Sequence, residues 1–218
     1  MRTKKILQRS LFLILLFAAV TANASITGYT DRASFDAAVP GALIEDWDSY
    51  AAGTTIPNIS SLNGINYGFS GIGIVTANYF NTTNPNSLGL TQIGQSIDYF
   101  TSADQGFFQF VGGISAFGID INTYATAGGS YQIETNFGEI ALSGYDPYPG
   151  LSTGQFVGFI SDRPIYQVNY SVEPAGQNYG YVLDTMRYSP SAVSEPSTFL
   201  LLGAGLAGAG ILRRRFKK

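Results

Sequence analysis

Carboxylates are the main candidates for chemistry in this 218-residue sequence, because it contains no His and no Cys. The two absences exclude Ser-His-Asp and Cys-His catalysis, zinc sites based on His and haem ligation by His. They also exclude disulfides, so an exported form of the chain must be stabilised by its buried core.

One acidic cluster surrounds the single tryptophan, Trp47. Glu45, Asp46 and Asp48 lie beside it, and Ca²⁺ prefers oxygen ligands of this kind. An exposed tryptophan can also stack on a sugar ring. Asp46, Trp47 and Asp48 are therefore a candidate calcium or sugar site. The alternative is a buried tryptophan with solvent-facing acids, and the pattern leaves both open because the acids occupy both faces of the expected strand.

Two further acids, Asp120 and Asp184, lie inside apolar stretches that are expected to be strands. A carboxylate in a strand interior needs exposure or a partner. Arg163 and Arg187 are the cations expected near them. An ion pair or a solvated face is one interpretation, and a metal site is the other.

A carboxylate-based hydrolase is a third possibility, since glycosidases need only two acids. Its candidates outside the first cluster are Glu134, Glu139 and Glu173, and their spacing singles out no pair. No glycine-rich phosphate loop opens a helix. The sequence therefore favours a protein that is not an enzyme.

The C-terminal segment, 194–218, has three parts in a fixed order. A short polar motif precedes an uncharged run rich in Leu, Ala and Gly at 198–212, and a basic cluster that begins with Arg213, Arg214 and Arg215 follows. As a helix, the apolar run is roughly 22 Å long. This is short of the ~30 Å hydrocarbon core, but it can span a thinned bilayer. The positive-inside rule places the cations in the cytoplasm, so the sequence predicts a transmembrane helix with the bulk of the chain on the other side.

These three parts resemble the PEP-CTERM sorting signal of exopolysaccharide-producing Gram-negative bacteria. Glu195-Pro196-Ser197 match its short motif, and the apolar run and the arginine cluster follow at the expected spacing. Ser194 replaces the first proline of the motif. The resemblance implies that an exosortase recognises Glu195, Pro196 and Ser197, cleaves the chain near them, and thereby delivers it to the cell surface or extracellular matrix.

The N-terminal segment has the pattern of a secretory signal peptide. Four cations precede an apolar run at 11–20, and an Ala-x-Ala site ends at Ala24. We therefore expect the secretion machinery to engage residues 1–24 and signal peptidase to cleave between Ala24 and Ser25.

The segment between the two ends, 25–189, is strongly acidic. It holds three of the twelve cations, Arg32, Arg163 and Arg187, against fourteen of the fifteen acids, which gives a net charge of −11. Such a surface repels nucleic acids and anionic lipids. With about 165 residues, the segment is long enough to bury one sizeable core.

The elements that must position the candidate residues are nearly all strands. A short helix is expected at 30–39, with Thr30 or Asp31 as its cap and with Phe35 and Ala38 facing inward. Alternating runs bounded by turn residues predict strands at 43–47, 65–69, 73–77, 97–101, 107–111, 114–122, 131–135, 140–142, 155–161, 165–172 and 179–188. Shared faces are expected in two of them, for Phe117, Ile119 and Ile121 and for Tyr166, Val168, Tyr170 and Val172.

Many short strands without a βαβ unit or a repeat predict an all-β fold, a jelly-roll-type β-sandwich, beside the signal-peptide helix and the transmembrane helix. The segments 31–38, 45–47, 116–120, 156–162 with Pro164, and 181–184 are also similar to the lectin-type or galactose-binding-like β-sandwiches that commonly precede PEP-CTERM tails. The predicted organisation is a signal peptide at 1–24, an ectodomain at 25–189, a linker at 190–193 and the sorting signal at 194–218.

Together these features predict an exported, non-enzymatic surface or matrix protein of a Gram-negative bacterium, anchored in the inner membrane until an exosortase processes it. No cofactor is expected, with Ca²⁺ as a candidate ion, and no nucleic acid is expected as a partner. The alternative is a carbohydrate-binding module, with or without calcium, so extracellular polysaccharide is a candidate partner.

Overall fold

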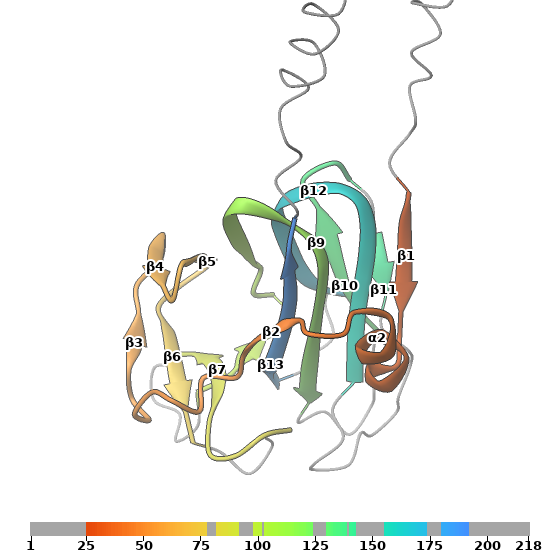
Figure 1. Ribbon diagram of the computed structural model, residues 1–218. Coiled ribbons are helices and arrows are strands. Elements are labelled where there is room, and N and C mark those ends of the chain that lie inside the picture. The colour runs from red at the N-terminus through yellow and green to blue at the C-terminus, as the bar shows by residue number, and fades with distance from the viewer. Residues whose placement is uncertain are drawn as a thin grey trace, which may run out of the picture.

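One continuous sheet of thirteen strands forms the part of the chain that the computed structural model describes (Figure 1). This part comprises residues 25–77, 82–91, 98–101, 103–123, 130–138, 140–142, 155–173 and 180–191. The prediction of an all-β fold is confirmed. A jelly-roll arrangement is not confirmed, because the main path of the sheet runs β11-β10-β12-β9-β13-β7-β6-β3 and the other strands pair beside this path.

The strands are short except for three. They are β1 (Ile26–Tyr29), β2 (Leu43–Glu45), β3 (Thr55–Ile56), β4 (Ser60–Leu62), β5 (Ile65–Phe69), β6 (Gly73–Thr76), β7 (Ser87–Leu90), β8 (Phe100–Thr101), β9 (Gly106–Thr123), β10 (Ser130–Thr135), β11 (Ile140–Leu142), β12 (Gln155–Glu173) and β13 (Gly180–Pro190). Sequence patterns missed β1, β3, β4 and β7, whose two to four residues are too few for a clear alternation.

The single described helix, α2 (Arg32–Ala38), lies within the range predicted for it. The Asp31 side chain caps it by accepting a hydrogen bond of 2.7 Å from the Ser34 N–H. Phe35 is buried, as expected, and packs with Ala116 and Phe156 of the sheet. The expected inward position of Ala38 is wrong, because this last helical residue is exposed.

The two longest strands, β9 and β12, each join two predicted strands into one and run through both halves of the sheet. Residues 106–110 of β9 pair with β5 and with 167–170 of β12, whereas 114–123 pair with 155–165 of β12 and with β13. Gly113 has a φ of 71° at the bend of β9, and the register of β12 shifts between Ile160 and Ile165. Bends of this kind let strands turn a corner, and both strands curve in Figure 1.

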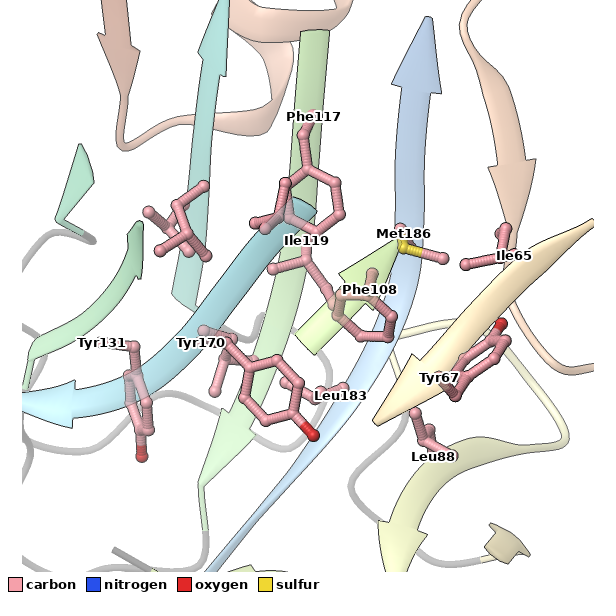
Figure 2. Close-up of a cluster of buried hydrophobic side chains, with 14 of the residues drawn as sticks. Ile65, Tyr67, Leu88, Phe108, Phe117, Ile119, Tyr131, Tyr170, Leu183 and Met186 are labelled. Atoms are coloured by element: carbon pink, nitrogen blue, oxygen red, sulfur yellow. The ribbon is translucent and has the colours of Figure 1, made fainter. Parts of the chain in front are cut away.

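Aromatic rings pack between the two halves of this bent sheet. The ring centroids of Tyr131 in β10 and Tyr181 in β13 are 5.1 Å apart, and those of Phe110 in β9 and Tyr188 in β13 are 5.2 Å apart. Figure 2 shows Phe108, Phe117 and Tyr170 in the same core. Contacts at these spacings stabilise the core of a protein without disulfides.

The prediction that alternate residues share one face of a strand is confirmed where the pairing of β9 with β12 is regular. Phe117, Ile119 and Ile121 are all buried in the core, and so are Val168 and Tyr170. The placement of Tyr166 with them is wrong, because its side chain is 50% exposed. A register shift between Ile165 and Gln167 breaks the two-residue period at this point. The side chain of Val172 lies outside the described part of the structure.

Replacing Gly106 with Ala is expected to lower the free energy of unfolding by about 2 kcal/mol. A Cβ at Gly106 would overlap the hydroxyl of Tyr170, which is itself buried, and the carbonyl oxygen of Gly68. Urea unfolding followed by tryptophan fluorescence measures the change. The matched control is Gly112→Ala in the same strand, since a Cβ there meets no atom within 4 Å. Equal stability of the two variants would contradict the packing argument.

Candidate functional site

A row of amide side chains crosses the outward face of the sheet in the half formed by β5, β9, β12 and β10. The strand register places Asn66 opposite Gln109, and Gln109 opposite Gln167. Gln109 Nε2 donates a hydrogen bond of 2.9 Å to Gln167 Oε1, and Gln167 Nε2 donates one of 2.7 Å to Asn169 Oδ1. These amides are half-buried, so the row is ordered before any ligand arrives.

An aromatic ring lies beside this row. Phe107 is opposite Gly68 on one side and Asn169 on the other. A Cβ at Gly68 would overlap the Phe107 ring, so the ring covers the bare backbone of that glycine. The Phe107 side chain is half-buried, which leaves part of the ring accessible.

Two hollows lie along this face. The larger, of about 550 Å³, is lined by residues that include Phe107, Asn169, Glu134 and Gln132. The smaller, of about 300 Å³, is lined by residues that include Asn66, Gln109, Gln167 and Tyr166. Both volumes fall within the range of about 300–1,000 Å³ for small-ligand clefts. Glu134 is the one charged residue among the residues that line the two hollows. The face can therefore offer amide hydrogen bonds and aromatic contact, but little charge.

Sequence reasoning did not identify this face. The signal that could have indicated it is a set of polar residues that each lie between two apolar or aromatic ones: Asn66, Gln109, Gln132, Gln167 and Asn169. Alternation shows that these residues point outward, but the pairing of four separate strands decides that they meet. Glu134, considered for hydrolysis, lies on this face, whereas Glu139 and the side chain of Glu173 lie outside the described residues.

Asp120 is fully buried on the opposite half of the sheet, beneath the start of α2. Its Oδ1 accepts a hydrogen bond of 2.9 Å from Arg32 Nε and lies 2.6 Å from Arg32 Nη2. Its Oδ2 lies 3.6 Å from Arg187 Nη1, and Arg187 Nε lies 2.9 Å from Asp36. Burial raises the pKa of Asp120 to about 7, although both arginines oppose this shift. The expected ion pair with Arg187 is confirmed, and the Arg32 partner was missed.

Asp184 is the cross-strand neighbour of Asp120 and is also fully buried. Its Oδ2 accepts hydrogen bonds of 2.5 Å and 2.9 Å from the N–H groups of Thr82 and Thr83. Its Oδ1 accepts a hydrogen bond of 2.7 Å from the Thr185 N–H. Burial raises the pKa of Asp184 to about 6 against these bonds. Asp184 therefore fastens the 82–83 segment to β13. Arg163, expected near one of these acids, instead lies 3.7 Å from the centre of the Phe137 ring.

The acidic cluster near the N-terminal end is bound within the protein. Trp47 is fully buried, so its ring cannot stack on a sugar, and the prediction of a core tryptophan is confirmed. The solvent-facing position expected for the acids is wrong for Glu45, which is buried. Glu45 accepts hydrogen bonds from the Trp47 N–H and from Asn63 Nδ2. Asp46 accepts one from the Asp48 N–H, and Asp48 accepts one of 2.7 Å from the Asn86 N–H. Within the described ranges, no three acidic side chains gather in a way that could hold a metal ion.

The predicted terminal segments lie outside the described residues. This applies to the signal peptide at 1–24, to Glu195, Pro196 and Ser197, to the helix expected at 198–212, and to Arg213, Arg214 and Arg215. Ser25, at the predicted cleavage site, is described, and its backbone N–H donates a hydrogen bond of 3.1 Å to Asp162. Among the residues that the structure does describe, no helix has the length and apolar character needed to cross a membrane.

Comparison with known proteins identifies the C-terminal segment. Residues 192–215 match the family model of the PEP-CTERM protein-sorting motif, so the chain carries this sorting signal. The motif supports an exported precursor that passes through a membrane and is processed by an exosortase.

No curated protein matches the sequence. The chain is similar in part to the crystal structure of a two-domain protein with unknown function from Bacteroides fragilis, at 13% identity and a TM-score of 0.29. The match covers 66% of this chain and 47% of that protein, so the chain spans less than half of its length. A similarity of this size carries no argument about fold or function.

Proposed function

We propose that this chain is a non-enzymatic protein of the bacterial cell surface or extracellular matrix, which an exosortase processes near Glu195-Pro196. The observation that carries the proposal is the PEP-CTERM motif at 192–215. The signal peptide at 1–24 directs the precursor through the inner membrane of a Gram-negative cell, and the apolar run at 198–212 holds it there. The acidic ectodomain then works outside the cell, in the exopolysaccharide or biofilm matrix.

The state of the buried acids supports a structural role for them. Asp120 is bound by Arg32 and Arg187, and Asp184 is bound by backbone N–H groups of its own chain. Both side chains are fully buried. A carboxylate that must accept a proton from a substrate or attack it needs access to that substrate, so these contacts favour a structural role for Asp120 and Asp184.

The mass of the protein in its native host tests the sorting proposal. We expect the form in the surface fraction to end near Ser194 to Ser197 and the form in the inner membrane to retain Lys218. Intact-mass measurement and C-terminal peptide analysis of the two fractions distinguish them. If every fraction retains the basic cluster, the C-terminal segment is a plain anchor and the matrix proposal fails.

A carbohydrate-binding module is the second candidate function, and the outward face of β5, β9, β12 and β10 favours it. Ordered amides beside an accessible aromatic ring suit a ligand with many hydroxyl groups and apolar ring faces. Calcium dependence is a separate proposal, because carboxylates of the acidic ectodomain could recruit the ion when a sugar binds. Comparing glycan binding with and without EDTA tests it.

A further inference from the structure

We infer that the outward face of β5, β9, β12 and β10 binds an uncharged polysaccharide, with the Phe107 ring against one sugar and the row from Gln109 to Asn169 bound to neighbouring hydroxyls. The inference names the ligand class and the site for the carbohydrate-binding candidate, and it rests on that candidate. The earlier sugar site at Trp47 plays no part in it.

The Phe107 ring provides the apolar contact for a sugar. Phe107 covers Gly68 with one part of its ring and remains half-buried, in a sheet whose other aromatic rings are largely in the core. The C–H groups on one side of a sugar ring form an apolar face that packs on an aromatic ring. The hollow of about 550 Å³ beside Phe107 provides room for such a contact.

The amide hydrogen bonds of the row all run in one direction. Gln109 donates to Gln167, and Gln167 donates to Asn169. Within the described residues, this leaves Asn169 Nδ2 as a donor at the larger hollow and Gln109 Oε1 as an acceptor at the smaller one. A hydroxyl group both donates and accepts, so sugar hydroxyls can satisfy both ends of the row.

The two hollows follow each other along β9 and β12. The pairs Gln109–Gln167 and Phe107–Asn169 are two residues apart along the same two strands, and each borders one hollow. Successive outward pairs of a sheet are about 7 Å apart along the strand. The two hollows therefore form consecutive positions, which suit a chain of sugars better than a single monosaccharide.

The lining of the two hollows carries little charge. Glu134 is the one charged residue that lines the hollows, and the segment 25–189 has a net charge of −11. Uronic acids, sulfated sugars and phosphate-bearing polymers would be repelled and would find no lining cation. The lack of a cation in this lining, together with the negative charge around it, therefore selects a neutral polysaccharide over an acidic one.

An array of polysaccharides tests the inference with the full chain, purified in a detergent without sugar headgroups. The array holds neutral glucans, galactans and mannans beside alginate and polygalacturonate. We expect binding to at least one neutral polymer and none to the acidic ones. Phe107→Leu keeps the cover over Gly68 but removes the ring, and Asn169→Ala removes the free donor. Each should weaken binding about fivefold, which is the effect of one ring contact or one hydrogen bond.

The matched control is Phe137→Ala. Phe137 is 45% exposed and lines neither hollow, and the guanidinium of Arg163 covers its ring, so this variant should bind like the parent chain. Thermal unfolding confirms that each variant is folded. Preference for the acidic polymers, absence of binding by the folded chain, or equal affinity of the Phe107→Leu and parent chains would each overturn the inference. None of these results would affect the sorting proposal, which depends on the C-terminal mass.

Discussion

Replacing Glu195 with Ala should leave nearly all of the protein as unprocessed precursor in the membrane. Glu195 is the only acid in the matched segment 192–215, so it is the one side chain there that can offer a negative charge to hydrogen-bond donors of the processing enzyme. Pro196 fixes the backbone beside it, which limits the conformations that the enzyme must select. Fractionation of the native host followed by immunoblotting measures the ratio of precursor to processed protein.

The control for this variant is Glu134→Ala, which makes the same chemical change on the outward face of the ectodomain. Its processing should match that of the parent chain. Normal processing of the Glu195→Ala variant would remove the role assigned to the motif. If the Glu134→Ala variant also remained unprocessed, the ectodomain would influence sorting.

Replacing Arg32 with Met should lower the free energy of unfolding by about 2 kcal/mol at pH 8, and by much less at pH 5. Arg32 is the closest partner of the buried carboxylate of Asp120, whose folded-state pKa is raised from 3.8 to about 7. Above pH 7 this carboxylate is charged, and loss of Arg32 leaves it with the more distant Arg187. At pH 5 the folded protein binds the proton, so the missing partner costs little.

The same shift predicts how the stability of the parent chain changes with pH. Between pH 3.8 and about 7 the folded state holds a proton on Asp120 that the unfolded state has lost, so stability falls as pH rises through this range. Asp184, with a pKa raised to about 6, acts in the same direction. Urea unfolding at pH 5 and pH 8 measures both effects. The control is Arg163→Met, which removes a cation that lies over the Phe137 ring and not beside Asp120. This variant should lose the same stability at pH 5 and at pH 8. An equal loss at both pH values for Arg32→Met would contradict the role of Asp120.

The sequence by itself determined the β class, the short helix with a cap at Thr30 or Asp31, and the sorting signal. Each depends on local information. Period-two alternation exposes strands such as β5 and β10, a capping residue marks a helix start, and the three parts of the C-terminal segment are adjacent in the chain. The predicted core was correct for Phe117, Ile119 and Ile121 because the pairing of β9 with β12 is regular there.

Tertiary structure decided which polar residues meet. Asp184 and Arg187 are three positions apart, so strict alternation would place them on opposite faces of β13. A register shift between them, where Thr185 has a φ of 42°, lets Arg187 reach the same carboxylate that neighbours Asp184. Arg32 is 88 residues from Asp120 in the sequence, and it reaches Asp120 because α2 packs against β12.

The amide row has the same origin, because Asn66, Gln109 and Gln167 become neighbours through the register of β5, β9 and β12. A bulge, a packing angle and a strand register each follow from contacts between distant segments, and no local pattern in the sequence encodes them.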